Sequence, residues 1–465
     1  MSYRVSRSCL PWMVVALMAF VGCSPKGETP SAETTGGENA SAATVPVAGS
    51  PTPARVASTD RNATNRIGPA DDDDSPERIA RDMLQAALRE SQGDVAGAID
   101  LWESALERLE RSVGADSWEY RTAEVGLAQA RQRIAFTLPQ RTMLVEIADL
   151  ERRGDRRVAE GDNAAALDYF VAALEKAAEV WGDRSHVTLS LRRKVAAQQE
   201  ATGDDTAALA SYLAVIGGRT SLYGESHPYV FEAIGDLARF HQHRERYDLA
   251  VQQATRRLSG CTALFGAESI RTAEAHNDLG AIYLDAQDPA RAAREFERSL
   301  ELRRRLTPED DGAIAFAERA LALTRLASGN TTDAESLLDD AIERLGRTAD
   351  STAAAEMKLQ RGTARMAQER FAEAEQDYRE ARETLAGSLD LAPLPYAESC
   401  FKLGYVLGRQ GRYSEAAPLL DEALRIQSLR LAPGDPILRR TEEIVALVRS
   451  KLEGTRVGAQ PTTLR

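Results

Sequence analysis

The 465-residue sequence predicts an all-α protein, a right-handed α-solenoid built from stacked helical hairpins. From about residue 76 onward, apolar residues recur with the period of an α-helix between short turns such as Gly-Asp and Arg-Tyr. Alanine and leucine are abundant and aromatic residues make up only 6%, which favours helices over an all-β fold. An alanine also returns at a nearly constant interval, which indicates that one structural unit is repeated.

The recurring alanine stands early in every second predicted helix. It occupies Ala98, Ala166, Ala208, Ala250, Ala292, Ala334, Ala374 and Ala416, at intervals of 68, 42, 42, 42, 42, 40 and 42 residues. Twelve residues earlier stands a small residue in every case: Ala86, Gly154, Ala196, Ala238, Gly280, Ala322, Gly362 and Gly404. Four residues later stands a large apolar residue in all but one case: Trp102, Phe170, Tyr212, Ala254, Phe296, Leu338, Tyr378 and Leu420. Small residues let two helices approach closely and a bulky residue fills the groove beside them, so the pattern predicts tight hairpins.

This spacing resembles the tetratricopeptide repeat. The segment Leu279-Gly280-Ala281-Ile282-Tyr283, followed by Ala292 and Phe296, matches the LGxxY and AxxxF elements of that family, with His276 in place of its leading Trp. The period of 42 residues and the turn Gly224-Glu225-Ser226-His227-Pro228 are similar to the longer repeats of kinesin light chains. The resemblance covers about residues 76–453 and implies hairpins that bury their apolar faces by stacking on one another.

The first 22 residues are predicted to be a signal peptide. Basic residues (Arg4 and Arg7) precede an apolar run over residues 10–21 that is short for a transmembrane helix. The end of this run, Phe20-Val21-Gly22-Cys23, resembles the lipobox of bacterial lipoproteins, which implies lipidation of Cys23 and a membrane-anchored protein of the cell envelope. The alternatives are an ordinary cleaved signal or an uncleaved anchor, with Cys23 incidental.

Residues 23–75 are predicted to be a disordered tether. Ser, Thr, Gly, Pro and Ala dominate, and no apolar periodicity is present, so the segment buries too little surface to offset its ordering entropy. A tether of this kind would hold a folded part clear of a membrane. The acidic run Asp71–Asp74 is interpreted as solvated rather than as a cation site.

Four further regions are expected. They are a first repeat plus an unpaired helix (76–140), the repeat array (141–434), a C-terminal capping helix (435–453) and a disordered tail (454–465). The first alanine interval exceeds 42 by 26 residues, about one helix and its turn, which predicts an extra helix near residues 116–136 and a break at Pro139. Glycines 182, 224 and 266 each follow an aromatic residue and are expected to end a helix, where a positive φ suits glycine.

The sequence offers no catalytic chemistry. It contains no nucleophile elbow, phosphate-binding loop, HExxH, EF-hand loop or dinucleotide glycine fingerprint. His186 and His227 fall in turns or at helix starts without metal-ligating neighbours, and Cys261 and Cys400 are expected to be buried as small hydrophobic residues. We therefore expect a protein that is not an enzyme and has no catalytic residues, metal or cofactor.

A binding surface is predicted on the first helix of each hairpin. Residues three before, one after and four after the small position share one stripe of that helix. The family resemblance implies that this stripe forms a concave face that holds peptides or partner helices. By position it contains Arg193, Arg239, Asn277, Arg319, Phe401 and Tyr405. For each residue alone, a solvated side chain on a structural spacer is the alternative.

The function expected from these features is an exported, lipid-anchored scaffold that binds a protein or peptide partner on its concave face. A net charge of −13 gives no indication of a nucleic-acid partner. The alternatives are a fixed subunit of an envelope assembly or secretion complex, and a solenoid enzyme or sugar-binding protein.

Overall fold

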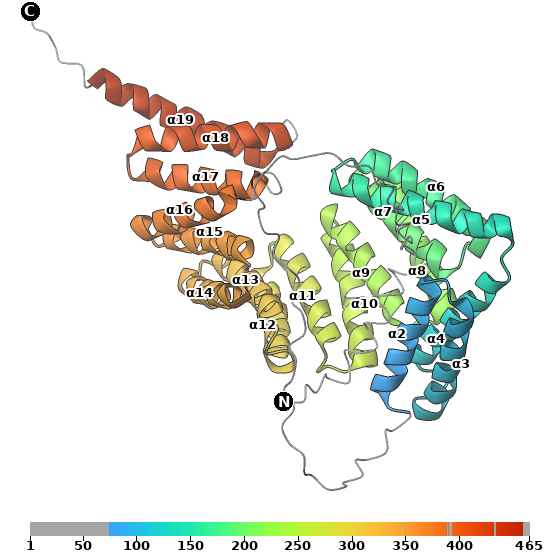
Figure 1. The fold of residues 1–465 in the computed structure, drawn as a ribbon. Coiled ribbons are helices and arrows are strands. Elements are labelled where there is room, and N and C mark those ends of the chain that lie inside the picture. Colours follow the sequence, from blue (N-terminus) through green and yellow to red (C-terminus); the bar gives the residue numbers. More distant parts are fainter. Residues whose placement is uncertain (1–73, 349, 388, 390–392, 432–433, 459–465) are drawn as a thin grey trace, which may run out of the picture. The chain divides into compact units, whose positions relative to one another are not determined.

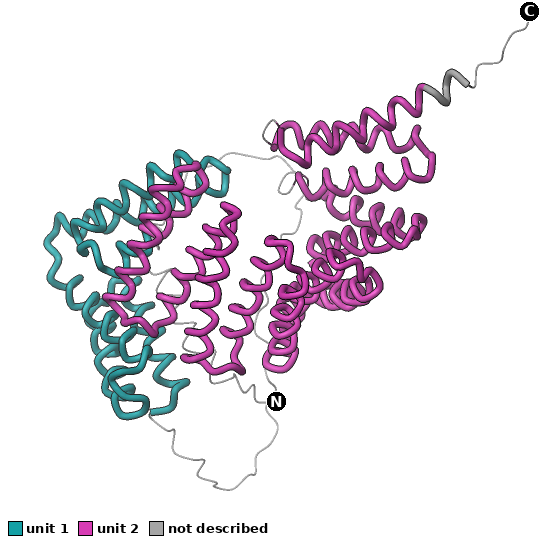
Figure 2. Tube along the Cα trace, turned by 180° about the vertical axis from the view of Figure 1, so that it is seen from behind, with its two compact units in different colours: residues 1–191 teal, residues 192–465 magenta. Residues whose placement is uncertain are grey.

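The computed structural model describes residues 74–348, 350–387, 389, 393–431 and 434–458 (Figure 1). The predicted signal peptide, Cys23, all but the last two residues of the predicted tether and residues 459–465 lie outside these described residues. Within the described part the chain forms eighteen helices, α2 to α19, and no strand, which confirms the all-α prediction. The chain divides into two compact units, residues 1–191 and 192–465 (Figure 2).

The first unit contains five helices and the start of a sixth. Their bounds are α2 (Pro76–Ser91), α3 (Val95–Ser112), α4 (Trp118–Ile134), α5 (Leu138–Ala159) and α6 (Asn163–Trp181), with α7 (His186–Ala201) continuing into the second unit. Helix α2 packs against α3, α3 against α4, and α5 against α6. A capping box between Thr137 and Gln140 starts α5, and Pro139 lies in its first turn, where no N–H is needed.

The second unit is a stack of hairpins. Its helices are α8 (Asp205–Tyr223), α9 (Pro228–His243), α10 (Tyr247–Phe265), α11 (Ile270–Asp285), α12 (Pro289–Leu306), α13 (Asp311–Ala327), α14 (Thr331–Thr348), α15 (Ser351–Ala367), α16 (Phe371–Ala386), α17 (Pro393–Arg409), α18 (Tyr413–Arg430) and α19 (Pro436–Gly458). From α8 to α19 each helix packs against the next one in the chain (Figure 1). Each odd-numbered helix from α9 also contacts the next odd-numbered one, so these first helices of the hairpins form one continuous layer.

The small and bulky positions meet as predicted. All eight recurring alanines have no exposed surface. A Cβ added to Gly280 would lie 3.0 Å from the ring of Phe296, and one added to Gly404 would lie 2.7 Å from Leu420 Cγ. Because real Cβ atoms rarely come so close, glycine at these positions is what lets the two helices of a hairpin touch.

Glycine also ends the helices where the sequence predicted it. Gly182, Gly224 and Gly266 follow α6, α8 and α10 with φ of 84°, 90° and 83°. A side chain at such a φ would be strained, whereas glycine adopts it freely. His227 then starts α9 as its N-cap, and its Nδ1 accepts a hydrogen bond of 3.1 Å from the backbone N–H of Tyr229.

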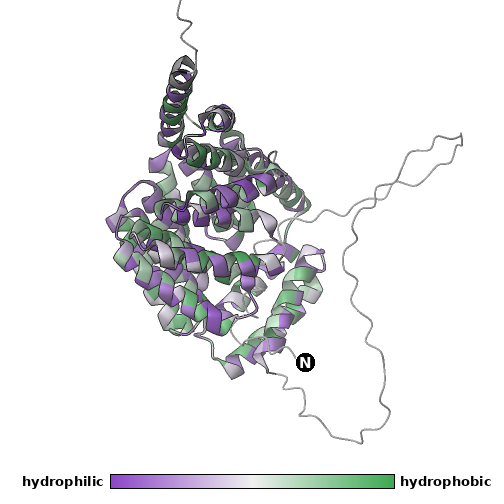
Figure 3. Ribbon diagram, turned by 90° about the vertical axis from the view of Figure 1, so that its left-hand side faces the viewer, coloured by the Kyte–Doolittle hydropathy of each residue, from purple (hydrophilic) through white to green (hydrophobic). Residues whose placement is uncertain are grey.

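Helix α9 is buried on nearly all sides. Twelve of its sixteen residues are buried, among them the polar Asp236 and His241. Elsewhere the helices alternate apolar and polar faces, as the hydropathy colouring shows (Figure 3). In the part of the chain that the structure describes, no helix combines the length and apolar character needed to span a membrane.

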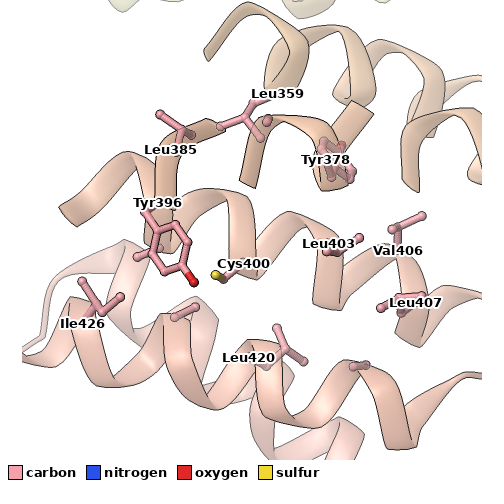
Figure 4. Packing of buried hydrophobic residues seen from close by; sticks show 14 of the residues in the cluster. Leu359, Tyr378, Leu385, Tyr396, Cys400, Leu403, Val406, Leu407, Leu420 and Ile426 are labelled. Carbon is pink, nitrogen blue, oxygen red and sulfur yellow. The ribbon is translucent and has the colours of Figure 1, made fainter. Parts of the chain in front are cut away.

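The C-terminal hairpin has a well-filled core. Cys400, Leu403 and Leu407 of α17 lie between neighbouring helices and approach Leu420 of α18 (Figure 4). Cys400 and Cys261 are free and buried, as predicted. Helix α19 reaches Gly458, so it extends into the segment predicted as a tail.

Candidate functional site

All six predicted binding residues lie in the second unit, on first helices of its hairpins. Arg193 is on α7, Arg239 on α9, Asn277 on α11, Arg319 on α13, and Phe401 and Tyr405 are on α17. Arg239 is exposed and the other five are half-buried. Helices α9, α11, α13 and α17 belong to the continuous layer described above, and α7 precedes it in the chain.

Arg193 and Arg239 share one carboxylate. Asp236 of α9, which is 7% exposed, accepts hydrogen bonds from the guanidinium of Arg239 and from Nε and Nη2 of Arg193, the latter at 3.0 Å. Arg193 Nη1 also donates to Glu232 Oε1 at 2.6 Å. The two arginines therefore form a cross-helix ion-pair network between α7 and α9. Sequence reasoning did not find Asp236 or Glu232, because the choice of an ion-pair partner depends on how far a side chain reaches across helices.

The network keeps its members charged. Burial lowers the pKa of Arg193, but hydrogen bonds to Asp236 and the charge of Glu232 outweigh burial and raise the pKa above its usual value. Burial raises the pKa of Glu232, but the charges of Arg219 and Arg193 outweigh it and lower the pKa below its usual value. Arg219 Nη1 donates to Glu232 Oε2 at 2.9 Å. The arginine and carboxylate side chains near α9 are thus charged, and they neutralise one another.

Asn277 is placed differently. Its side chain is half-buried on α11 and makes no hydrogen bond with another described residue, whereas its neighbours are engaged. His276 Nδ1 lies 2.6 Å from Glu295 Oε2, and Asp278 accepts from Arg257. The amide of Asn277 can therefore offer both a donor and an acceptor to a ligand.

Arg319 is only loosely held. Its Nη1 lies 3.8 Å from Glu356 Oε2 on α15, and its buried Nε has no hydrogen-bond acceptor within the described chain. A charge pair at this distance is not a hydrogen bond and constrains the side chain weakly. Arg319 is available to a carboxylate on a partner.

Phe401 and Tyr405 form an aromatic pair. Their ring centroids are 6.2 Å apart with an interplanar angle of 16°. The guanidinium carbon of Arg440, on α19, lies 5.9 Å from the centre of the Phe401 ring. The sequence showed Arg440 only as a charge on a capping helix, because helical periodicity does not reveal which ring lies under a cation from another helix.

The structure joins some predicted residues and leaves others apart. Asp236 links Arg193 with Arg239, and Phe401 stacks with Tyr405. For Asn277 and Arg319, no hydrogen bond, ion pair or ring contact joins them to another of the six over the residues described. The predicted stripe is therefore a row of separate contact points rather than one compact site.

A hollow lies elsewhere in the second unit. It has a volume of about 490 Å³ and is lined by residues of α12, α13 and α14, namely Glu297, Leu300, Glu301, Arg304, Arg305, Leu321 and Leu337. None of these is aromatic, so the hollow lacks the stacking surface typical of sugar sites. The described residues also contain no group of three or more His, Cys, Asp or Glu arranged to hold a metal ion.

Comparisons with known proteins agree with the repeat pattern. A family model described as a tetratricopeptide repeat matches residues 229–305 and 271–347, and a second model with the same description matches residues 397–429. No curated protein matches the chain.

Several solved structures are similar to the chain. BtubC (BKLC) from P. vanneervenii shares 23% identity at a TM-score of 0.40, over 50% of this chain and 92% of that one. A putative kinesin light chain from P. anserina shares 16% identity at a TM-score of 0.39, over 46% of this chain and all of that one. A signal-transduction ATPase with a tetratricopeptide repeat sensor, from Pyrococcus horikoshii, shares 10% identity at a TM-score of 0.50, over 81% of this chain and 52% of that one.

The family matches coincide with the hairpins whose small and bulky residues interlock. Residues 229–347 contain α10 to α13 with Gly280, Ala292 and Phe296, and residues 397–429 contain Gly404 and Leu420. The chain therefore contains tetratricopeptide repeats, at residues 229–347 and 397–429.

Proposed function

We propose that this protein is an exported, lipid-anchored scaffold that binds a protein or peptide partner on the first-helix layer of its second unit. The observation that supports the proposal most directly is Asn277. Its half-buried amide has unused hydrogen-bonding capacity, while the neighbouring His276 and Asp278 are engaged. A peptide backbone has donors and acceptors that match such an amide.

The rest of the stripe supplies complementary chemistry. Arg319 presents a weakly paired cation, and Phe401 with Tyr405 presents an apolar aromatic surface. Arginine and aromatic residues are enriched in binding hot spots because they combine a large contact area with directed polar groups. Separate contact points along one layer suit an extended segment better than a small molecule.

The proposed anchor depends on the N-terminal sequence. The basic start, the apolar run and Phe20-Val21-Gly22-Cys23 are the features that support lipidation of Cys23. Mass spectrometry of the protein from its native envelope should find a lipid-modified N-terminal cysteine. Cys23→Ser should release the protein from the membrane fraction. The control Cys9→Ser should leave the protein in that fraction, because Cys9 precedes the apolar run. An unmodified mature chain that still fractionates with membranes would contradict the anchor.

In-cell photocrosslinking tests the scaffold proposal. A photoreactive residue at position 277 should capture a distinct protein, and the same residue at exposed Gln252 of α10 should not. The captured protein, purified, should bind the wild-type chain, and Asn277→Arg should weaken that binding because a longer charged side chain blocks the site. Equal, diffuse capture from both positions would exclude the first-helix layer as the binding surface.

A further inference from the structure

Helix α17 carries an aromatic pair, Phe401 and Tyr405, that is only partly covered by the rest of the described chain. The buried side of this helix holds Cys400, Leu403 and Leu407, which fill the core of the last hairpin (Figure 4). Phe401 and Tyr405 are half-buried beside this core, and Phe401 packs against its edge. Residues four apart share a helix face, so the two rings form one surface at the C-terminal end of the first-helix layer.

Arg440 supplies an uncommitted positive charge at this surface. It lies over the ring of Phe401, and no carboxylate of the described residues lies within 4 Å of its guanidinium. Two arginines of the neighbouring α18 region contrast with it, because Arg412 pairs with Glu375 and Arg425 pairs with Glu422. A guanidinium that stacks on a ring leaves its N–H edge directed outward, where it can bind a carboxylate through two hydrogen bonds.

A second group with free donor capacity lies beside the rings. The hydroxyl of Tyr405 makes no hydrogen bond within the described part of the chain. Lys402, on the same helix, donates to Thr363 Oγ1 at 2.9 Å and lies 3.4 Å from Glu398 Oε1, so its charge is partly used. The surface therefore combines apolar rings with one unpaired cation and one free hydroxyl donor.

We propose that this aromatic and cationic surface, defined by Phe401, Tyr405 and Arg440, binds an acidic segment of a protein partner. A carboxylate side chain of the partner pairs with Arg440, and an adjacent apolar side chain packs on the two rings. The inference rests on the proposed function and names the chemistry of the partner. A long polyanion such as nucleic acid is disfavoured because the chain carries a net charge of −13, whereas a short acidic segment needs only the local positive charge of Arg440.

Peptide selection on the purified full-length protein tests this chemistry. A library of random twelve-residue peptides displayed on phage is selected against wild-type protein in detergent. Selected peptides should contain Asp or Glu next to a large apolar residue. Arg440→Glu should lower their affinity by about tenfold or more, since an attractive contact becomes repulsive. The matched control Arg439→Glu makes the same charge change at an exposed neighbouring position and should leave affinity within about twofold.

The outcomes separate the two proposals. If the peptides bind but carry no acidic residue, or if Arg440→Glu and Arg439→Glu have equal effects, the acidic-segment inference is wrong while the scaffold proposal stands. If a photoreactive selected peptide crosslinks only to second helices of the hairpins, the first-helix layer itself is excluded. Displacement of the peptides by a short single-stranded oligonucleotide would overturn the inference in favour of nucleic acid. Phe401→Leu keeps the position apolar, and it should weaken binding while a cooperative melting curve shows that the protein remains folded.

Discussion

The ring of Tyr378 on α16 lies against the backbone of Gly362 on α15, where an added Cβ would come within 2.5 Å of Tyr378 Cε1. Tyr378 is 3% exposed, so the ring has little room to withdraw. Gly154 and Phe170 repeat this relationship in the first unit, also at 2.5 Å. The interlocking of a glycine with a bulky residue is therefore a recurrent way of closing these hairpins.

Gly362→Ala should destabilise the protein. The added methyl group must displace the Tyr378 ring or spread the hairpin, and overpacking of this kind costs about 1–3 kcal/mol. Gly217 of α8 is the matched control, because no atom lies within 4 Å of an added Cβ and the residue is exposed. Gly217→Ala should instead stabilise by roughly 0.5–1 kcal/mol. Urea unfolding midpoints of the two variants would settle this, and a stabilising Gly362→Ala would contradict the close packing.

Asp236→Asn should also destabilise the second unit. The substitution removes the charge that Arg193 and Arg239 share, at a position only 7% exposed, and should cost about 2 kcal/mol. Asp149→Asn on α5 provides the comparison, because Asp149 pairs with Arg152 and Arg153 at a solvated site. That change should leave the unfolding midpoint nearly unchanged. Equal losses in thermal unfolding would mean that the α7–α9 network contributes no more than a surface pair.

His241 should make the protein less stable at mildly acidic pH. Burial and the charge of Arg246 lower the pKa of His241, so the folded state binds a proton less readily than the unfolded state. Stability is therefore complete above the ordinary histidine pKa and falls as the pH drops through it. His241→Gln should reduce the loss of melting temperature between about pH 7.5 and about pH 5.5. Parallel pH profiles for the two proteins would show that His241 does not contribute.

The two buried thiols should be inert in the folded protein. Burial raises the pKa of Cys261 to about 11 and also raises that of Cys400. Since the thiolate is the reactive form, iodoacetamide at about pH 8 should modify neither residue until denaturant is added. Peptide mass spectrometry measures each cysteine separately. Rapid labelling of Cys261 without denaturant would mean that α10 opens locally.

The hairpin register was predictable because it follows from residue size. The spacing of Gly280, Ala292 and Phe296 places a small residue, a second small residue and a bulky one where two helices must touch, and the structure confirms that contact. The helix-ending glycines were predictable for a similar reason, because few other residues adopt a positive φ without strain.

The polar connections were not predictable in the same way. A helical stripe identifies which face Arg193 occupies, but an arginine side chain reaches carboxylates on several neighbouring turns and helices. Its partners Glu232 and Asp236 are 39 and 43 residues away. The position of Arg440 over Phe401 depends likewise on how α19 lies against α17, which residue periodicity does not determine.

The burial of α9 has a consequence for how the second unit opens. In a repeat stack the free energy of opening rises with the number of neighbours that a helix must leave. Because twelve of its sixteen residues are buried, the amide hydrogens of α9 should exchange with solvent more slowly than those of α19, the last helix of the stack. Local unfolding would then begin at the aromatic and cationic surface of α17 and α19. The proposed binding surface would therefore also be the first part of the unit to unfold.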